Sequence, residues 1–456
     1  MTDAARSAHP ALDSLAERLG DRLLYPGDPA WDSARSPWNL AIDQHPAAVA
    51  SPADVAELQA LLAAARADGL QLAVQPSGHG ASGTLDGTVL VRTAAFDLLE
   101  VDTAARVARI GAGVKMGRLL EALAGTGLVA MSGSSAVVNA TAFTLGGGHA
   151  WFARSFGFGS SSLRAVELLT ADGRHRWLRD ADEPELLWAL RGAGGAFGVV
   201  TAIEVDLHEA AVLTGGRLVF DGADAAAVLR ATVAAGRTAP DSLALHAAAI
   251  RVPDVPEAPA DLRGTSFVSV EAVELGDSAI ARAALDVIRG AATVIADTYG
   301  PIDAPALTAI AEEPTDPSPG FGWSALADLD EASVDRLVAA WQSPEGQPVM
   351  GLALRVLGGA LAEPPRRPAI AGAVSEAHIV SAHAMGVPAL AEPAARAFEA
   401  LDAALGVTAS DRTLCTFLSP GSGYSGAYAE SDVARAARIK VTVDPENVFR
   451  GNRDFA

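Results

Sequence analysis

The sequence predicts an α+β fold, in which capped helices and antiparallel strands occupy separate stretches of the chain. Three observations carry this prediction: a helix start at residues 51–54, a hairpin pattern around residues 171–173, and Ala-rich helical stretches that alternate with strands after residue 208. The chain has 456 residues, half of them apolar, which is enough for two or three domains with a large core.

The first helix is expected to begin at Ser51. Serine is a good N-cap residue, Pro52 suits the first helical position, and Asp54 places an acid in the first turn. Apolar residues then recur at helical spacing until Gly69, which ends the helix. A second helix is expected to carry the leucines of segment 119–123.

Short apolar runs near these helices predict strands. Residues 71–74 form one such run, and Asp86-Gly87 turns the chain into another at 89–91. A third run covers residues 106–110. We therefore expect alternating strands and helices over the first 130 residues or so.

A hairpin is expected next, because the apolar runs 166–170 and 174–178 flank the turn sequence Ala171-Asp172-Gly173. Apolar and polar residues alternate along 199–207, which predicts a half-buried strand. After residue 208, strands at 242–250 and 266–273 alternate with Ala-rich helical stretches, so a separate α+β unit is expected there.

Composition excludes several classes of function. The net charge of -21 disfavours nucleic acid and anionic membranes as partners. Cys415 is the only cysteine, so an intrachain disulfide is impossible and no metal site is expected. Residues 1–10 lack the apolar core of a signal peptide, and no run of eighteen apolar residues exists. A cytoplasmic enzyme that is a monomer or homodimer is therefore expected.

Three glycine-rich stretches are the most informative motifs. The first reads Val74-Gln75-Pro76-Ser77-Gly78-His79-Gly80-Ala81-Ser82-Gly83 and follows a predicted strand. The second is Thr144-Leu145-Gly146-Gly147-Gly148-His149, and the third runs from Trp188 to Thr201. Backbone amides in such loops can approach a diphosphate closely, because little side chain stands in the way. His79 then has room to face a flat ring.

In this order the three stretches resemble the FAD-linked oxidases of the berberine bridge enzyme type, within the vanillyl-alcohol-oxidase-like flavoproteins that share a PCMH-type FAD-binding domain. Residues 437–452 are similar to the closing motif of that family. The resemblance implies an FAD-binding domain built from residues 1–208 and 411–456. It also implies an inserted substrate-binding domain at 209–410, made of an antiparallel sheet covered by helices.

The resemblance implies a covalent bond from a ring nitrogen of His79 to the 8α-methyl group of FAD. This family usually has Arg-Ser-Gly-Gly-His here, whereas this chain has Gln75-Pro76-Ser77-Gly78-His79. The alternative is a surface histidine in a turn. Many relatives attach the flavin a second time through a cysteine at the place of Ser135, so at most one covalent bond is expected here.

The same resemblance implies a set of FAD-binding residues, with Gly198 and Val200 at the adenine end and Asn447 on the flavin side. Asn139 and Ala142 stand where the family commonly has glycine. The complete set is His79, Pro76, Ser77, Gly78, Gly80, Ala81, Gly133, Ser134, Val138, Gly146, Gly147, Gly148, Gly198, Val200 and Asn447.

Catalytic residues are harder to assign. Flavin oxidation needs a base that takes a proton as the hydride leaves the substrate. Many relatives use a Tyr-x-Asn element, but the matching residues 414–418 contain neither. Tyr424, Tyr428 and His149 are the candidates, with surface tyrosines as the alternative. His246, on an alternating strand, either faces the flavin or is an ordinary core histidine.

Three functions remain open. The favoured one is an oxidase that passes a hydride from a small hydroxylated or amine-bearing metabolite to FAD, with O2 as acceptor. A sugar, a secondary alcohol, or a polyketide or alkaloid intermediate of secondary metabolism would fit. The second is a flavin-dependent dehydrogenase or a non-oxidative tailoring enzyme, which the missing Tyr-x-Asn motivates. The third is a non-catalytic flavin-binding relative.

Overall fold

The computed structural model describes residues 9–256 and 260–455. Residues 1–8 lie outside this part. They make up most of segment 1–10, for which the sequence predicts no signal peptide. Within the described residues the strands form three large sheets and one two-stranded pair. No helix of the described chain combines the length and the apolar character needed to cross a membrane.

The first sheet joins the two ends of the chain. Its strand order is β1-β2-β4-β3-β20, and β20 near the C-terminus runs parallel to β3. The strands are β1 (Leu23–Leu24), β2 (Ala48–Ala50), β3 (Gln71–Val74), β4 (Thr88–Val91) and β20 (Phe449–Arg450). The helices of this region are α2 (Pro10–Asp13), α3 (Ala16–Leu19), α4 (Trp31–Arg35) and α5 (Val55–Ala67).

Helix α5 begins later than the sequence predicts. Asp54 is the N-cap instead of Ser51, because its backbone is extended and its carboxylate accepts the N–H of Glu57 at 2.8 Å. The side chain of Glu57 in turn accepts the N–H of Ala53 at 2.8 Å. The backbone N–H groups of Ala53 and Glu57 at the start of the helix therefore both have a hydrogen-bond partner. The predicted end at Gly69 agrees with its φ of +67°.

The second sheet is antiparallel, in the order β5-β6-β10-β8-β9. Its strands are β5 (Leu99–Asp102), β6 (Val107–Gly111), β8 (Leu163–Leu169), β9 (His175–Arg179) and β10 (Val199–Asp206). The predicted hairpin is the β8–β9 pair. Strand β10 is buried almost throughout, not half-buried as expected, because it is the central strand between β6 and β8.

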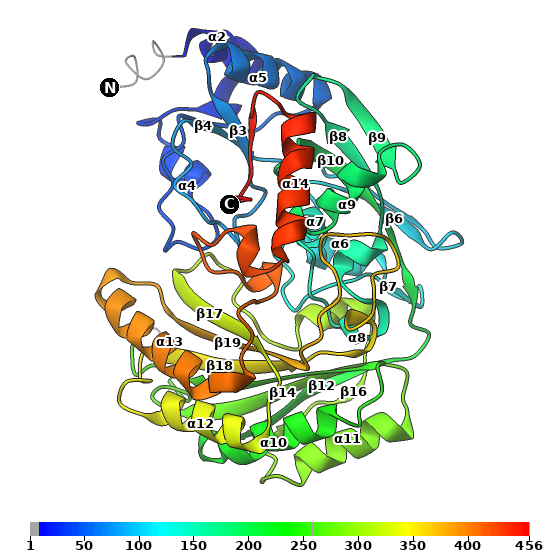
Figure 1. Cartoon of the computed structure of the whole chain (residues 1–456), viewed down its shortest axis with the longest axis vertical. Coiled ribbons are helices and arrows are strands. Elements are labelled where there is room, and N and C mark those ends of the chain that lie inside the picture. Colours follow the sequence, from blue (N-terminus) through cyan, green and yellow to red (C-terminus); the bar gives the residue numbers. More distant parts are fainter. Residues whose placement is uncertain (1–8, 257–259, 456) are drawn as a thin grey trace.

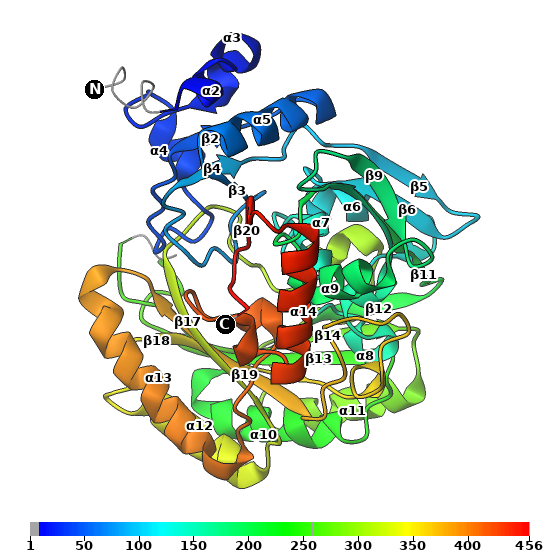
Figure 2. The same cartoon turned by 45° about the horizontal axis from the view of Figure 1, so that its top comes forward.

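Helices and a small strand pair accompany this sheet. They are α6 (Met116–Ala122), α7 (Ala140–Leu145), α8 (Ala153–Phe156), α9 (Pro184–Ala193), and β7 (Leu128–Val129) with β11 (His208–Glu209). In Figure 1 these elements occupy the side of the molecule away from α4, and Figure 2 shows the same arrangement from above.

The third sheet has the order β15-β12-β14-β13-β18-β19-β17, and β16 pairs with β12. Its strands are β12 (Leu213–Asp221), β13 (Leu243–Arg251), β14 (Ser266–Leu275), β15 (Ala296–Asp297), β16 (Gly300–Pro301), β17 (Gly320–Ala327), β18 (Val349–Val356) and β19 (His378–Met385). Four helices cover its outer face: α10 (Ala225–Gly236), α11 (Ala279–Arg289), α12 (Glu331–Gln342) and α13 (Ala391–Leu405). The other face is turned toward the rest of the chain (Figure 1).

After α13 the chain returns to its first half. Helix α14 (Glu430–Val443) packs against α9, where Arg435 pairs with Glu185 at 2.6 Å and lies 3.9 Å above the ring of Trp188. Figure 1 shows α14 in red among elements of the first half. The closing segment therefore lies beside residues that are more than 200 positions earlier in the sequence.

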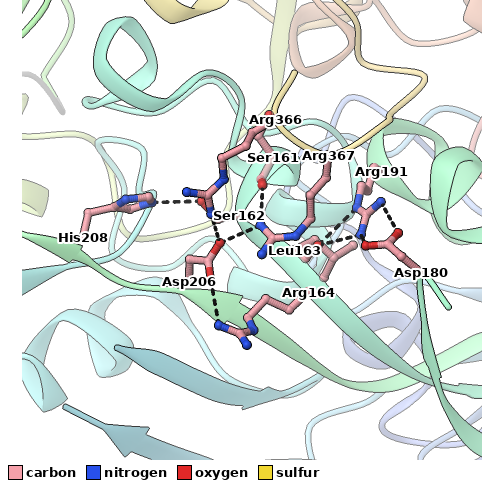
Figure 3. Close-up of polar contacts among 10 residues, drawn as sticks. All are labelled: Ser161, Ser162, Leu163, Arg164, Asp180, Arg191, Asp206, His208, Arg366 and Arg367. Carbon is pink, nitrogen blue, oxygen red and sulfur yellow. Dashed lines mark hydrogen bonds and ion pairs between the residues drawn. The ribbon is translucent and has the colours of Figure 1, made fainter. Parts of the chain in front are cut away.

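The connector between β18 and β19, residues 357–377, ties the third sheet to the second (Figure 3). Asp206 at the end of β10 pairs with Arg164 of β8 at 3.1 Å and with Arg366 and Arg367 of this connector. The fully buried Arg191 binds Asp180 through two nitrogens and also donates to the carbonyl of Pro368 at 3.1 Å. These contacts fix the position of the third sheet against the first half.

Candidate active site

A cavity of about 430 Å³ lies where the three sheets and the C-terminal segment meet, and we call it the central cavity. It brings together most of the residues predicted for the cofactor and for catalysis. Those that line it are Pro76, Ser77, Gly78, His79, Gly80, Ala81, Gly133, Ser134, Val138, Gly146, His149, Gly198, Val200 and Tyr424.

His79 presents a free ring nitrogen inside this cavity. Its loop follows β3, and its ring stacks on Trp38 with the centroids 4.3 Å apart. Nδ1 lies 3.1 Å from the hydroxyl of Ser77, whereas Nε2 is buried without a hydrogen-bond partner among the described residues. Burial, and to a smaller extent Lys115, lowers the pKa of His79 to about 4, so the ring is neutral at pH 7.

The backbone of the His79 loop requires glycine at position 78. Gly78 has φ of +76°, and a Cβ there would lie 2.6 Å from the Cβ of Pro37. Arg92 supports the same loop, because it donates to the carbonyl and to the side-chain oxygen of Gln75 at 2.9 and 3.2 Å. Arg92 is not recognisable from the sequence as a support of this loop, because it lies on a different segment and meets Gln75 only in the fold.

Asn139, which stands where the related family has glycine, has a structural role. It is the N-cap of α7, where its side chain accepts the N–H of Ala142 at 2.8 Å and donates to the carbonyl of Ala112 at 2.7 Å. The substitution therefore anchors α7 to the second sheet. The cavity-lining Ser134 on the same wall donates a hydrogen bond to Glu313.

Three predicted cofactor contacts lie elsewhere. Gly147 and Gly148 line a second cavity of about 270 Å³ behind this wall, which we call the rear cavity. Asn447 is exposed in a turn with φ of +52°, and its carbonyl accepts from the side chain of Gln71 at 2.7 Å. The central cavity is lined instead by Asn452, which donates to the carbonyl of Gly80 at 2.6 Å.

The predicted catalytic tyrosines differ in position. Tyr428 does not line the central cavity, because its hydroxyl donates to the buried carbonyl of Gly192 at 2.8 Å and the residue borders the rear cavity. Tyr424 lines the central cavity next to Cys415, and burial raises the pKa of its hydroxyl well above the usual value. Tyr428 is therefore separated from the central cavity, where the predicted catalytic role would require it to lie.

His149 lies at the boundary between the first half of the chain and the third sheet. Its Nδ1 is 3.4 Å from a guanidinium nitrogen of Arg355, and its ring is 5.8 Å from the ring of His246. Burial first, and Arg355 second, lower the pKa of His149 to about 3. The ring is therefore neutral and has a nitrogen lone pair at neutral pH.

A row of polar residues crosses the inner face of the third sheet. Strand register places Arg217, Glu271, His246 and Arg355 side by side on four neighbouring strands. The ring of His246 stacks on Trp151 at 4.4 Å. Burial raises the pKa of Glu271 to about 7. Glu271 and Arg355 are not recognisable from the sequence as site residues, because only the register of the strands brings them into one row.

Part of this chain is similar to known FAD-linked proteins. Residues 46–179 match the model of the FAD binding domain family. The (R)-6-hydroxynicotine oxidase of Paenarthrobacter nicotinovorans is 33% identical over 189 residues, which are 41% of this chain and 41% of that protein. The FAD-linked oxidoreductase afoF of Emericella nidulans is 32% identical over 180 residues, 38% of this chain and 36% of that one. These matches thus span about two-fifths of each relative.

Solved structures resemble the whole chain. The wild-type BBE-like 1 protein of Physcomitrella patens superposes with a TM-score of 0.81 at 19% identity, over 98% of this chain and 99% of that one. The 6-hydroxy-D-nicotine oxidase of Arthrobacter nicotinovorans gives a TM-score of 0.81 at 25% identity, over 95% and 97%. The α+β fold class and the family resemblance predicted from the sequence are confirmed.

Proposed function

From the premise that this chain carries an FAD-binding domain in the vanillyl-alcohol-oxidase-type fold, we propose that it is an FAD-dependent oxidoreductase, specifically an oxidase. Its substrate is a small hydroxylated or amine-bearing metabolite, and O2 is the final acceptor. The observation that carries this proposal is the buried, unpartnered Nε2 of His79 inside a glycine-lined cavity. A buried polar atom without a partner needs an explanation, and a group bonded to it inside the cavity supplies one.

The residues of the central cavity fit FAD. When bound, FAD supplies the hydride acceptor. The loop that carries Ser77 and Gly78, the wall that carries Gly133 and Gly146, and the third stretch that carries Gly198 offer backbone amides and little side-chain bulk. In the proposal these residues hold the cofactor, and Asn452 takes the place expected for Asn447.

We assign the covalent attachment to Nε2 of His79. Ser77 occupies Nδ1 at 3.1 Å, so Nε2 is the ring nitrogen left free for the bond, and it carries the lone pair when the proton is on Nδ1. The lowered pKa of about 4 keeps the ring unprotonated, as a nucleophilic nitrogen must be. Ser135 offers no thiolate, so one covalent bond is the maximum from these two positions.

We assign the proton acceptor to His149. It is the predicted catalytic histidine that lines the central cavity, and its neutral ring can take the proton of a substrate hydroxyl or amine. Tyr424 lies on the same cavity and orients the substrate as a hydrogen-bonding group. The substrate-binding domain in this proposal is residues 209–410, whose sheet supplies the inner wall. The enzyme is expected to be cytoplasmic, as a monomer or homodimer.

One experiment separates an oxidase from the alternatives. The purified protein is reduced chemically without air, air is admitted, and the return of the flavin absorbance is followed together with peroxide formation. Fast reoxidation with one peroxide per flavin supports the oxidase. Slow reoxidation without peroxide would instead favour a dehydrogenase or a tailoring enzyme.

A further inference from the structure

Arg355 is a cation without a carboxylate partner at the edge of the central cavity. It is half-buried on β18 and lines the cavity. Within the described residues its hydrogen-bonding contact is His149 Nδ1 at 3.4 Å, and one face of its guanidinium lies 5.0 Å from the ring centre of Phe417. Neither neighbour carries negative charge, so most of its donors remain available.

The nearby carboxylates do not satisfy this guanidinium. Glu313 also lines the central cavity, but its carboxylate accepts a hydrogen bond from Ser134 and forms no ion pair with Arg355 among the described residues. Glu271 lies two strands away, with His246 between them in register. Both act on Arg355 only through space, and neither forms an ion pair with it among the described residues. A desolvated guanidinium without a direct partner is costly, so its retention fits a role in binding.

We propose that the substrate of this site carries a carboxylate group and that Arg355 binds it on the sheet side of the central cavity. The guanidinium fork matches a carboxylate through two parallel hydrogen bonds, and Phe417 holds the fork in its plane. This inference rests on the proposed function for the reaction that follows binding, but the binding itself does not depend on it.

The rest of the cavity indicates what the carboxylate is attached to. Phe417 lines the cavity beside Arg355, outside the wall that holds the cofactor, so the part of the substrate next to its carboxylate contacts an aromatic ring. The whole chain has a net charge of -21, which repels anions at long range. Arg355 is therefore the local cation that selects an acid over a neutral analogue of equal shape.

The test compares benzoate with its neutral isostere benzamide. Each is titrated into the protein with its cofactor bound, and binding is followed by the flavin absorption spectrum and by the melting temperature. We expect benzoate to bind at least roughly tenfold more tightly than benzamide. Equal affinity of the two, or tighter binding of benzamide, would overturn the proposal.

Substitutions test whether the preference for benzoate depends on Arg355. Arg355→Gln should weaken benzoate by about a hundredfold and abolish its advantage over benzamide, whereas Arg355→Lys should keep part of that advantage. Arg217→Gln is the matched control, because Arg217 lies in the same row but is paired with Glu312 at 2.8 Å. A benzoate preference that survives in Arg355→Gln, or disappears in Arg217→Gln, would contradict the assignment.

The result is distinguishable from failure of the proposed function. The melting temperature reports benzoate binding whether or not the protein is active or reoxidised by O2. If the protein prefers benzoate but forms no peroxide, the inference about carboxylate binding is supported and the proposed oxidase function is ruled out. If the protein forms peroxide but shows no preference for benzoate, the oxidase function is supported and the inference about carboxylate binding is overturned.

Discussion

The two walls of the central cavity are built from different chemical material. The wall from the first half consists of loop backbone and small residues, such as Gly78 and Gly133, with His79 as its reactive side chain. The opposite wall presents charged and aromatic side chains, with Arg355 from the third sheet and Glu313 and Phe417 from segments outside its strands. A wall of backbone groups suits the binding of a fixed cofactor, whereas a wall of side chains suits the selection of a particular substrate. Retention of the cofactor and recognition of the substrate should therefore be separable by mutation.

The largest effect on the cofactor wall is expected from His79→Ala. The variant should lose all covalently bound flavin, because no other described side chain of the loop offers a nucleophilic ring nitrogen. Binding of benzoate at Arg355 should remain measurable once free FAD is added. Flavin attachment is measured as the flavin fluorescence that stays with the polypeptide in a denaturing gel, and bound flavin in the variant would contradict the role of His79.

The sequence located the backbone wall well, for a physical reason. The loop 74–83 is contiguous and follows a strand that the apolar run 71–74 predicts correctly, so its residues stay together in the fold. Asn447 does not line the cavity because the turn before β20 leaves it exposed, and the chain reaches the cavity five positions later at Asn452.

The sheet wall could not be located in this way. Glu271, His246 and Arg355 are neighbours only through the register of three strands, and a one-residue slip would turn each of them to the other face. The position of Tyr428 could not be predicted, because the sequence gives no indication that Gly192 would accept its hydroxyl. Side chains that meet across long loops need the pairing of the strands to be known.

Gly78→Ala tests the backbone wall without changing any functional group. The new Cβ would be 2.6 Å from Pro37 at a φ of +76°, so we expect a loss of about 3 kcal/mol in the free energy of unfolding and less attached flavin. Gly80→Ala is the matched control, because a Cβ there meets nothing within 4 Å. Equal stability of the two variants in chemical denaturation would count against a tight loop.

Glu271→Gln tests the charge of the sheet wall. Burial first raises the pKa of Glu271 to about 7 from 4.5; Glu313 adds to the rise, and Arg355, Ser269 and Arg217 oppose it. A carboxyl group with a raised folded pKa contributes its stability below about pH 4.5 and loses it as the pH rises through 7. At pH 8 the variant should therefore exceed the native protein by about 2 kcal/mol in unfolding free energy.

The check on Glu271→Gln is a series of urea unfolding curves between pH 5 and pH 8. The difference in stability between the two proteins should grow with pH across this range. A difference that is constant with pH would show that Glu271 does not titrate near neutrality.

The smallest expected effect is that of Tyr428→Phe, which removes a hydroxyl from the rear cavity and leaves the central cavity intact. Loss of the hydrogen bond to the carbonyl of Gly192 should cost about 1 kcal/mol of unfolding free energy. In Tyr428→Phe the reoxidation of reduced flavin by O2 should be unchanged. In contrast, His149→Gln should slow the oxidation of the substrate. A large loss of turnover in Tyr428→Phe would return this tyrosine to the catalytic group.

The central claim, that Nε2 of His79 holds the flavin, is tested most directly on the native protein. The purified chain is denatured in acid, digested, and analysed for a flavin-bearing peptide by fluorescence and mass spectrometry. Fluorescence on the peptide that contains His79, with the added mass of the cofactor on that residue, is the expected result. Complete release of the flavin into solution, or attachment to any other residue, would contradict it.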